Sequence, residues 1–291
     1  MVHTFRAGHD QGPVDGLRLA RASQAPARHP PRRARAIDTA RSIAVTSGKG
    51  GVGKTQLSAN LAISLARRGQ SVLLLDADLG LASLDLALGV HPGHDLLAVV
   101  RGQRRLHEII VEAAEGVHLV PACPGRYDMA DLPNDEREQL HAALRELAAE
   151  YDCVIIDTGA GIGANTVGFA ALGSEILLVT TAEPTSLRDA YAMAKVLHKR
   201  AGVDAIRVIA NQVSCEAAGL EVYERLSGIA CRFLSIELDY LGCVPWDAAV
   251  PRAVTQGRPY VVSAPHSKAS RALETVVNKL ITHGVSSGVV C

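Results

Sequence analysis

The strongest chemical signal in the chain is a stretch of glycines and lysines between two apolar segments. Residues 43–47 form an apolar, β-branched run, the next nine read Gly-Lys-Gly-Gly-Val-Gly-Lys-Thr-Gln, and residues 57–66 carry apolar side chains at helical spacing. Glycines let the backbone curl so that successive N–H groups converge on one phosphate group. The order of strand, glycine-rich turn and helix therefore predicts a phosphate-binding loop for a nucleotide.

Two side chains of this loop have predicted roles of their own. Lys54 is expected to neutralise the β- and γ-phosphates and to act in catalysis, and the Thr55 hydroxyl is expected to be a ligand of Mg²⁺. A chance match to a short pattern is the alternative, but the flanking strand and helix both argue against it. The residues expected to line the cofactor site are Gly48, Lys49, Gly50, Gly51, Val52, Gly53, Lys54, Thr55 and Gln56.

Lys49 is a second cation in the loop, and it would repel Lys54 unless phosphate oxygens lie between the two. A solvated loop charge is the alternative explanation. Residues 49–55, Lys-Gly-Gly-Val-Gly-Lys-Thr, resemble the deviant Walker A motif of the MinD/ParA family of ATPases. The resemblance implies that ATP is the nucleotide and that Lys49 is catalytic, reaching across an ATP-bound homodimer to the phosphates of the partner subunit.

Acidic residues follow two of the predicted strands, and ligands of parallel sheets lie beyond the carboxyl ends of the strands. Asp157 closes the apolar run 153–157 ahead of a glycine-rich stretch. We expect Asp157 to hold Mg²⁺ through the metal's water shell, while a cap on the following turn is the alternative.

Asp76 and Asp78 follow another apolar run. Two carboxylates so close repel each other unless a cation or a proton-donating water lies near them. We expect Asp78 to lie beside the metal ion and orient the attacking water, with Asp76 supporting the loop. The reverse assignment stays open.

A candidate base pocket lies at two later strand ends. Asn211 ends the apolar run 206–211, and its amide offers a donor and an acceptor, which suits the N6/N7 edge of adenine. A turn-forming asparagine is the alternative. Pro245 and Asp247 are expected to form the other wall of the pocket, and Trp246 is either part of that wall or an ordinary core aromatic.

Segments of strand length alternate with segments of helical periodicity from residue 43 onward. Continuous apolar runs are typical of strands buried on both faces of a parallel sheet. The sequence therefore predicts one α/β domain of the P-loop NTPase class, with a mostly parallel central sheet and helices on both faces. Besides the strand and helix that flank the loop, we expect strands at residues 72–76, 117–121, 153–157, 176–180, 206–211 and 241–244, and helices at residues 134–150, 186–200 and 269–281.

Composition argues for a cytoplasmic protein. The chain has 291 residues, 48% of them apolar, which is enough for a full core, and it contains no apolar run of membrane-spanning length. Its start lacks the apolar core of a signal peptide. Six cysteines stand at no paired or metal-ligating spacing, so we interpret them as reduced core residues of a cytosolic protein, with no cysteine-bound metal.

The formal net charge of zero hides a basic N-terminal segment. Residues 1–42 hold eight arginines against three aspartates, a balance of +5, so residues 43–291 carry −5. An acidic domain is not drawn onto nucleic acid, and we expect no specific nucleic-acid partner. Only the N-terminal segment has the charge for such contacts.

We expect three parts: a flexible tail at residues 1–42, an ATPase domain at residues 43–284 and a short tail at residues 285–291. The first tail combines a short helical segment with an arginine- and proline-rich linker, and it is either a solubilising extension or a docking peptide on a tether. The apolar stripe at residues 269–281 is expected to pack on the sheet. Because the residues after it make a poor amphipathic anchor, membrane contact should be weak or absent.

Further segments narrow the resemblance to the FlhG/FleN branch of MinD-like ATPases, which controls flagellar number and placement. These segments are residues 75–85, 183–192 and 267–270. The resemblance implies slow ATP hydrolysis, a homodimer in the ATP-bound state, and a transcription regulator or flagellar switch component as a partner. It also leaves open recruitment to the inner face of the membrane or to the cell pole.

The N-terminal Asp10 and Gln11, with Leu17 and Arg18, are similar to that branch's short helix, which stimulates the partner GTPase FlhF. The resemblance therefore implies docking of an FlhF-like GTPase. Pro13 would interrupt a helix begun earlier, so stimulation of the GTPase does not follow from the similarity alone.

Three competing classes remain. A ParA-type partition ATPase would bind DNA without sequence preference, against which the acidic domain argues. A MinD-type division-site ATPase is disfavoured by the N-terminal extension and by the missing membrane helix. A non-hydrolysing scaffold is disfavoured because Lys54, Thr55, Asp78 and Asp157 are all present.

Overall fold

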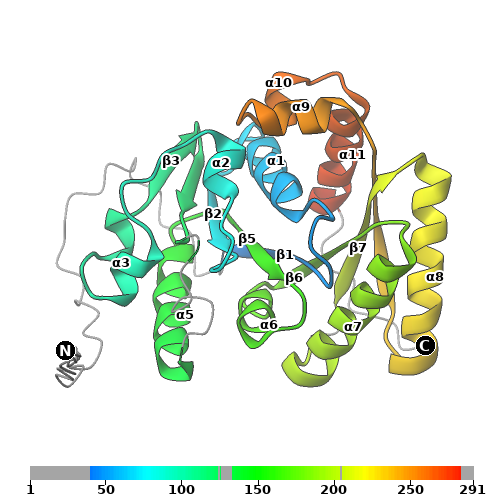
Figure 1. The fold of residues 1–291 in the computed structure, drawn as a ribbon, viewed down its shortest axis with the longest axis horizontal. Coiled ribbons are helices and arrows are strands. Elements are labelled where there is room, and N and C mark those ends of the chain that lie inside the picture. Colours follow the sequence, from blue (N-terminus) through cyan, green and yellow to red (C-terminus); the bar gives the residue numbers. More distant parts are fainter. Residues whose placement is uncertain (1–39, 124, 126–132, 204, 283–291) are drawn as a thin grey trace, which may run out of the picture.

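The computed structural model describes residues 40–123, 125, 133–203 and 205–282 (Figure 1). An eight-stranded sheet forms its centre, in the order β3-β4-β2-β5-β1-β6-β7-β8. β3 is antiparallel to β4, and every other neighbouring pair is parallel. The predicted mostly parallel sheet is therefore confirmed. The strands are Arg41–Ser47 (β1), Val72–Ala77 (β2), Val111–Ala114 (β3), Val117–Val120 (β4), Cys153–Ala160 (β5), Glu175–Thr180 (β6), Ile206–Val213 (β7) and Leu238–Pro245 (β8).

Helices cover both faces of the sheet, as predicted (Figure 1). The first face carries Lys54–Ala66 (α1), Leu84–Leu88 (α2), Ala249–Thr255 (α9), Tyr260–Ser263 (α10) and Lys268–Thr282 (α11). The second face carries Leu96–Val100 (α3), Asn134–Ala148 (α5), Ala164–Ala170 (α6), Pro184–Ala201 (α7) and Glu216–Leu234 (α8). A 3₁₀ turn, η1, spans Leu106–Glu108.

Alternation along each strand feeds two apolar layers. In β2, Leu73 and Leu75 pack with the second-face helices, whereas Val72 and Leu74 pack with the first-face helices. All four side chains are at most 1% exposed. Burial on both sides is the reason that the central strands are continuous apolar runs, and it holds their carboxyl ends in fixed register.

The edge of the sheet where the parallel strands begin is held by a partly buried ion cluster. Glu175, at the start of β6, accepts hydrogen bonds from Arg41 and from Arg207, with 3.3 Å between Arg207 Nη1 and Glu175 Oε2. Arg41 also donates to the Leu280 carbonyl at 2.6 Å, which ties β1 to α11. β1 thus begins at Arg41, ahead of residue 43, where the domain was predicted to start.

α8 and the short elements β3, α2, α3, η1, α6, α9 and α10 are absent from the sequence-based prediction. Gly219 and Gly228 weaken the helical signal of α8, because glycine has a low helix propensity. Close packing explains Gly219: a Cβ atom there would lie 2.5 Å from the Cys243 Cβ atom of β8. The contact that requires this glycine comes from another strand, so no local pattern reveals it.

The interpretation of the cysteines was partly wrong. Cys123 and Cys153 are free and buried, but Cys215 is exposed and Cys231 and Cys243 are half-buried. Within the described ranges, no group of three or more His, Cys, Asp or Glu residues could hold a metal ion. No helix in the same part of the chain is long and apolar enough to cross a membrane.

The predicted N-terminal tail with its docking helix, apart from the residues from Ala40 onward, lies outside the described residues, as does the short C-terminal tail.

The apolar stripe of α11 packs on the first face of the sheet, as predicted. Ala269, Leu273, Val276 and Val277 are at most 1% exposed. The prediction was wrong for Ile281, which is 40% exposed at the end of the helix, where the sheet no longer covers it.

This difference within one stripe gives a test of the packing. Leu273→Ala should lower the free energy of unfolding by about 2–5 kcal/mol, because it leaves a cavity in a closed layer. Ile281→Ala is the matched control, and it should cost less than about 1 kcal/mol because water already reaches that side chain. Urea unfolding followed by circular dichroism measures both. Equal losses would mean that α11 is not anchored as described.

Candidate nucleotide-binding site

The glycine-rich turn between β1 and α1 lies at the carboxyl end of the central strand and is held by close backbone packing. A Cβ atom at Gly48 would lie 1.8 Å from the Asp189 carbonyl oxygen of α7. Gly53 has φ +93° and caps α1, and a Cβ atom there would lie 2.4 Å from Asn211 Nδ2. Only glycine fits at either position, so these two glycines fix the shape of the turn.

Lys54 is a buried cation at the start of α1. It is 8% exposed, and its Nζ atom donates to Ser47 Oγ at 3.0 Å. Ser47 Oγ in turn donates to the Lys49 carbonyl at 2.7 Å. Burial lowers the pKa of Lys54, while the carboxylates of Asp157 and Asp78 oppose this effect. A buried ammonium with so few oxygen partners is suited to receive an anion.

Asp157 is the carboxylate beneath the loop. It is 1% exposed and accepts a hydrogen bond from Ser58 Oγ at 3.0 Å. Burial raises the pKa of Asp157 to about 6, although a hydrogen bond with Thr55 and the charge of Lys54 both oppose the rise. A divalent cation at this point would restore the ionised form. Thr55 and Asp157 therefore lie together, where the sequence analysis expects the metal ligands.

Asp76 and Asp78 differ sharply in their surroundings. Asp76 is 2% exposed and accepts hydrogen bonds from the backbone N–H groups of Asp78, Ser83 and Leu84 at 3.0–3.2 Å. Burial, and next the charge of Asp157, raise the pKa of Asp76 to about 8. These three backbone contacts tie Asp76 to the loop after β2 and hold that loop in shape.

Asp78 is half-buried, and its Oδ1 atom accepts from the Leu81 N–H at 3.1 Å. A Cβ atom at Gly159 would lie 3.4 Å from the same oxygen, so the loop after β2 lies against the end of β5 here. Of the two carboxylates, Asp78 is the one that keeps access to solvent. It is therefore the better placed to hold a water molecule.

Lys49 does not point at the carboxylates beneath the loop. Its ammonium group pairs with Glu183 and donates to Thr185 Oγ1 at 3.1 Å, at the start of α7. The pair is exposed, and Lys49 lowers the pKa of Glu183. Exposed ion pairs contribute little to stability, so this contact is easily exchanged for another.

Asn211 holds the loop from β7. Its Nδ2 atom donates to the Val52 carbonyl at 2.7 Å, and the side chain is buried. Gln212, which has a positive φ of 57°, donates from Nε2 to the Gly51 carbonyl at 3.2 Å. The amide predicted to contact adenine therefore has a structural contact with the phosphate loop, and its contact with adenine stays a prediction.

The end of β8 contributes Pro245, Trp246 and Asp247. Asp247 accepts from the backbone N–H groups of Ala249 at 2.8 Å and Ala269 at 3.2 Å, and these bonds lower its pKa. Its carboxylate thus joins the starts of α9 and α11. Trp246 is 64% exposed, which rules out the core alternative and leaves it at the rim of an open hollow.

The arrangement fits a nucleotide with a magnesium ion. Magnesium is usually held by one or two carboxylates together with substrate phosphates, which matches the donor set of Thr55 and Asp157. Gln56 Oε1, next to Thr55, is buried with no hydrogen-bond partner in the part of the chain that is described. The buried ammonium and the N–H groups at the start of α1 supply the complementary anion site.

Several supporting residues escaped the sequence analysis. Ser58 follows Lys54 by one helical turn, a spacing that could have indicated it. Glu183 and Gln212 have no such signal, because they are separated from their loop partners by 134 and 161 residues.

The chain is similar to known proteins both in sequence and in structure. The family model of the CobQ/CobB/MinD/ParA nucleotide binding domain matches residues 43–260. The chain is 41% identical over 238 residues to the antiactivator FleN of Pseudomonas aeruginosa, which covers 82% of this chain and 85% of that protein. It is 36% identical over 241 residues to the flagellum site-determining protein YlxH of Helicobacter pylori, covering 82% and 81%.

Among solved structures, the septum site-determining protein MinD of Pyrococcus horikoshii, complexed with Mg-ADP, is similar with a TM-score of 0.71 and 29% identity. The similarity covers 83% of this chain and 96% of that one. That structure therefore contains a nucleotide and a magnesium ion, the two groups that Lys54, Thr55 and Asp157 are suited to bind.

The two contacts considered for Asn211 can be separated by one substitution. Asn211→Asp cannot donate to the Val52 carbonyl, so it should weaken ADP binding about tenfold, or ~1.4 kcal/mol. If Asn211 acts through the loop, the ratio of the ADP and IDP affinities, measured calorimetrically, should not change. A ratio that falls toward one would assign the amide to the adenine amino group instead. Gln212→Ala, at the exposed neighbouring contact, is the control and should cost less than about threefold.

Proposed function

Because the chain belongs to the CobQ/CobB/MinD/ParA nucleotide-binding family, we propose that it is a Mg·ATP-dependent switch that dimerises with ATP and regulates flagellar number or placement. ATP hydrolysis, at a slow rate, ends the dimeric state. The flagellar assignment is supported by the identity to FleN and YlxH, whose names describe an antiactivator and a flagellum site-determining protein. The switch assignment is supported by Lys49. Its ammonium group forms an exposed ion pair with Glu183 at the start of α7, and the phosphates of a partner subunit can replace Glu183 in that contact.

Each site residue has a role in this proposal. When bound, Mg·ATP supplies the γ-phosphoryl group and a cation that balances its charge. Lys54 and the N–H groups of the loop hold the phosphates, and Thr55 and Asp157 hold the metal. Asp78 orients the attacking water, and Asp76 keeps the loop after β2 in shape through its three backbone contacts.

Partners follow from the same proposal. An FlhF-like GTPase docks on the N-terminal Asp10 and Gln11. A transcription regulator or flagellar switch component binds the ATP-bound dimer. Recruitment to the inner face of the membrane or to the cell pole occurs through such partners. The ATPase domain, which begins with β1 at Arg41, is the part that switches, and the residues before it act as its tether.

Substitution of Lys49 tests ATP-dependent dimerisation directly. Lys49→Ala should keep nucleotide binding within about threefold of wild type yet remain monomeric with Mg·ATP, because the cradle keeps Lys54 while the cation for the partner's phosphates is lost. Light scattering on a sizing column measures this. Glu183→Ala is the control, since it releases Lys49 without removing it and should still dimerise. A Lys49→Ala protein that dimerises with ATP would end the proposal of a role in trans.

Asp78 is expected to act on turnover without acting on binding. Asp78→Ala should reduce ATP hydrolysis about 10²-fold or more and so trap the ATP-bound dimer, because the phosphate cradle stays intact. Phosphate release over time gives the rate, with Asp85→Ala as a nearby carboxylate control. Unchanged turnover in Asp78→Ala would transfer the role to Asp76.

The tail gives a prediction about the partner. Deletion of residues 1–22 should leave the thermal midpoint and the ATP turnover unchanged but abolish stimulation of the partner GTPase. The reason is that residues 1–22 are expected to be joined to the domain by a random-coil linker with a span of roughly 20–25 Å. GTP hydrolysis by an FlhF-type GTPase, with and without the tail, is the measurement. A midpoint several degrees lower would show that residues 1–22 belong to the fold.

A further inference from the structure

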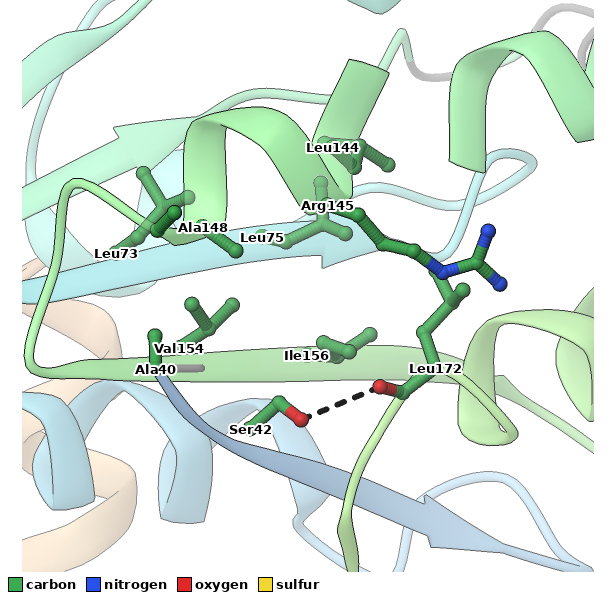
Figure 2. Close-up of a pocket in the computed structure, with 11 residues that line it drawn as sticks. Ala40, Ser42, Leu73, Leu75, Leu144, Arg145, Ala148, Val154, Ile156 and Leu172 are labelled. Atoms are coloured by element: carbon green, nitrogen blue, oxygen red, sulfur yellow. Dashed lines mark hydrogen bonds between the residues drawn. The ribbon is translucent and has the colours of Figure 1, made fainter. Parts of the chain in front are cut away.

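An apolar groove lies on the second face of the sheet, away from the phosphate loop (Figure 2). Leu73, Leu75, Val154 and Ile156 of β2 and β5 form its floor, and the walls come from α5 and from Leu172 after α6. The walls include Leu144, Arg145, Ala148 and Ala149. The groove encloses about 250 Å³, which is enough for an aliphatic side chain. An apolar cavity of this kind is not stabilised by water, so an apolar group that fills it would be favoured.

The chain itself enters this groove at its N-terminal side. Ala40 and Ser42 line it, and Ser42 Oγ donates to the Leu172 carbonyl at 3.2 Å (Figure 2). Arg41 between them is fixed by Glu175 and by the Leu280 carbonyl. The residues that precede Ala40 therefore start from a fixed point on the groove wall. Three residues span at most about 10 Å, so their side chains remain within reach of it.

One apolar residue is available at that distance. Ile37 is the only large apolar residue between Leu19 and Ala40, in a stretch otherwise made of alanines, prolines, arginines and other polar residues. An isolated isoleucine in such a linker has no partner nearby in the sequence. The groove is an apolar surface that begins three residues away.

Charge is complementary at the rim. Asp38 is the only acidic residue between Asp15 and Asp76. The guanidinium group of Arg145 extends along the groove mouth near Leu172 (Figure 2), is exposed, and has no ion-pair partner among the described residues. The apolar Ile37 thus matches the apolar floor of the groove, and the anionic Asp38 that follows it matches the cation Arg145 at the rim.

We propose that residues 36–39 dock on the chain's own groove, with the Ile37 side chain between α5 and the floor of β2 and β5 and the Asp38 carboxylate beside Arg145. The docked segment closes the second apolar layer at β1. It also fixes the point from which the arginine- and proline-rich linker leaves the domain, beside α5 and α6. The inference concerns the fold of the chain and does not depend on the identity of any partner protein.

Truncation of the full-length protein is the first test. Removing residues 1–35 keeps Ile37 and should leave the thermal midpoint within about 1 °C of wild type, whereas removing residues 1–39 should lower it by roughly 2–6 °C. In the full chain, Ile37→Asp should reproduce the loss, and Ala34→Asp should not. Equal midpoints for the two truncations, or for Ile37→Asp and wild type, would overturn the proposal.

A direct contact measurement distinguishes this occupant from others. In a methyl-labelled sample, the Ile37 δ1 methyl group, assigned by Ile37→Val, should show NOEs to methyl groups of Leu73, Leu144 or Leu172. A mixed sample of labelled and unlabelled chains should show these contacts within one chain. Cross-peaks between chains would assign the groove to a second copy, and no cross-peaks from a coil-like Ile37 would leave the segment undocked. Either of these last two results contradicts the proposal.

Discussion

Buried charge beneath the phosphate loop is the constraint on which the rest of the structure depends. Lys54 and Asp157 are 8% and 1% exposed, and charges removed from water destabilise a fold unless other polar groups compensate them. Ser47, Ser58 and Thr55 compensate only in part, as the raised pKa of Asp157 indicates. The remaining compensation is what a phosphate group and a magnesium ion supply, so the site is organised in advance for both.

The scaffold around these charges has two kinds of contact: close packing at the phosphate loop and a half-buried contact at Asp78. Gly48 packs against the α7 backbone, and Gly53 and Val52 contact the Asn211 side chain of β7, so these contacts fix the loop. The loop after β2 instead lies against the end of β5, where the half-buried Asp78 faces the buried Gly159. The proposed switch requires that an ordered γ-phosphate moves the loop after β2 and, through the contact of Asp78 with the end of β5, the segment that follows β5.

Local patterns were sufficient to predict the loop, the parallel sheet and the acids at the strand ends, because glycine spacing, apolar runs and strand ends are all read within a few residues. Contacts between distant segments were not predictable. Glu183 binds Lys49 across 134 residues, and the Asp247 carboxylate accepts hydrogen bonds from the backbone N–H groups of Ala249 and Ala269. Ile281 continues the apolar stripe of α11 but projects beyond the sheet, and Gly219 is required by Cys243 on another strand. In each case the deciding partner is brought close only by the completed fold.

The central claim is that the γ-phosphate, beyond the phosphates of ADP, orders the loops after β2 and β5. Hydrogen–deuterium exchange of the wild-type protein with Mg·ADP and with a non-hydrolysable Mg·ATP analogue tests it most directly. Residues 48–55 should be protected equally by both nucleotides, whereas residues 79–83 and 159–163 should gain protection only with the analogue. If the two nucleotides give the same exchange in those two loops, the site binds nucleotide without sensing the γ-phosphate, and the switch account is contradicted.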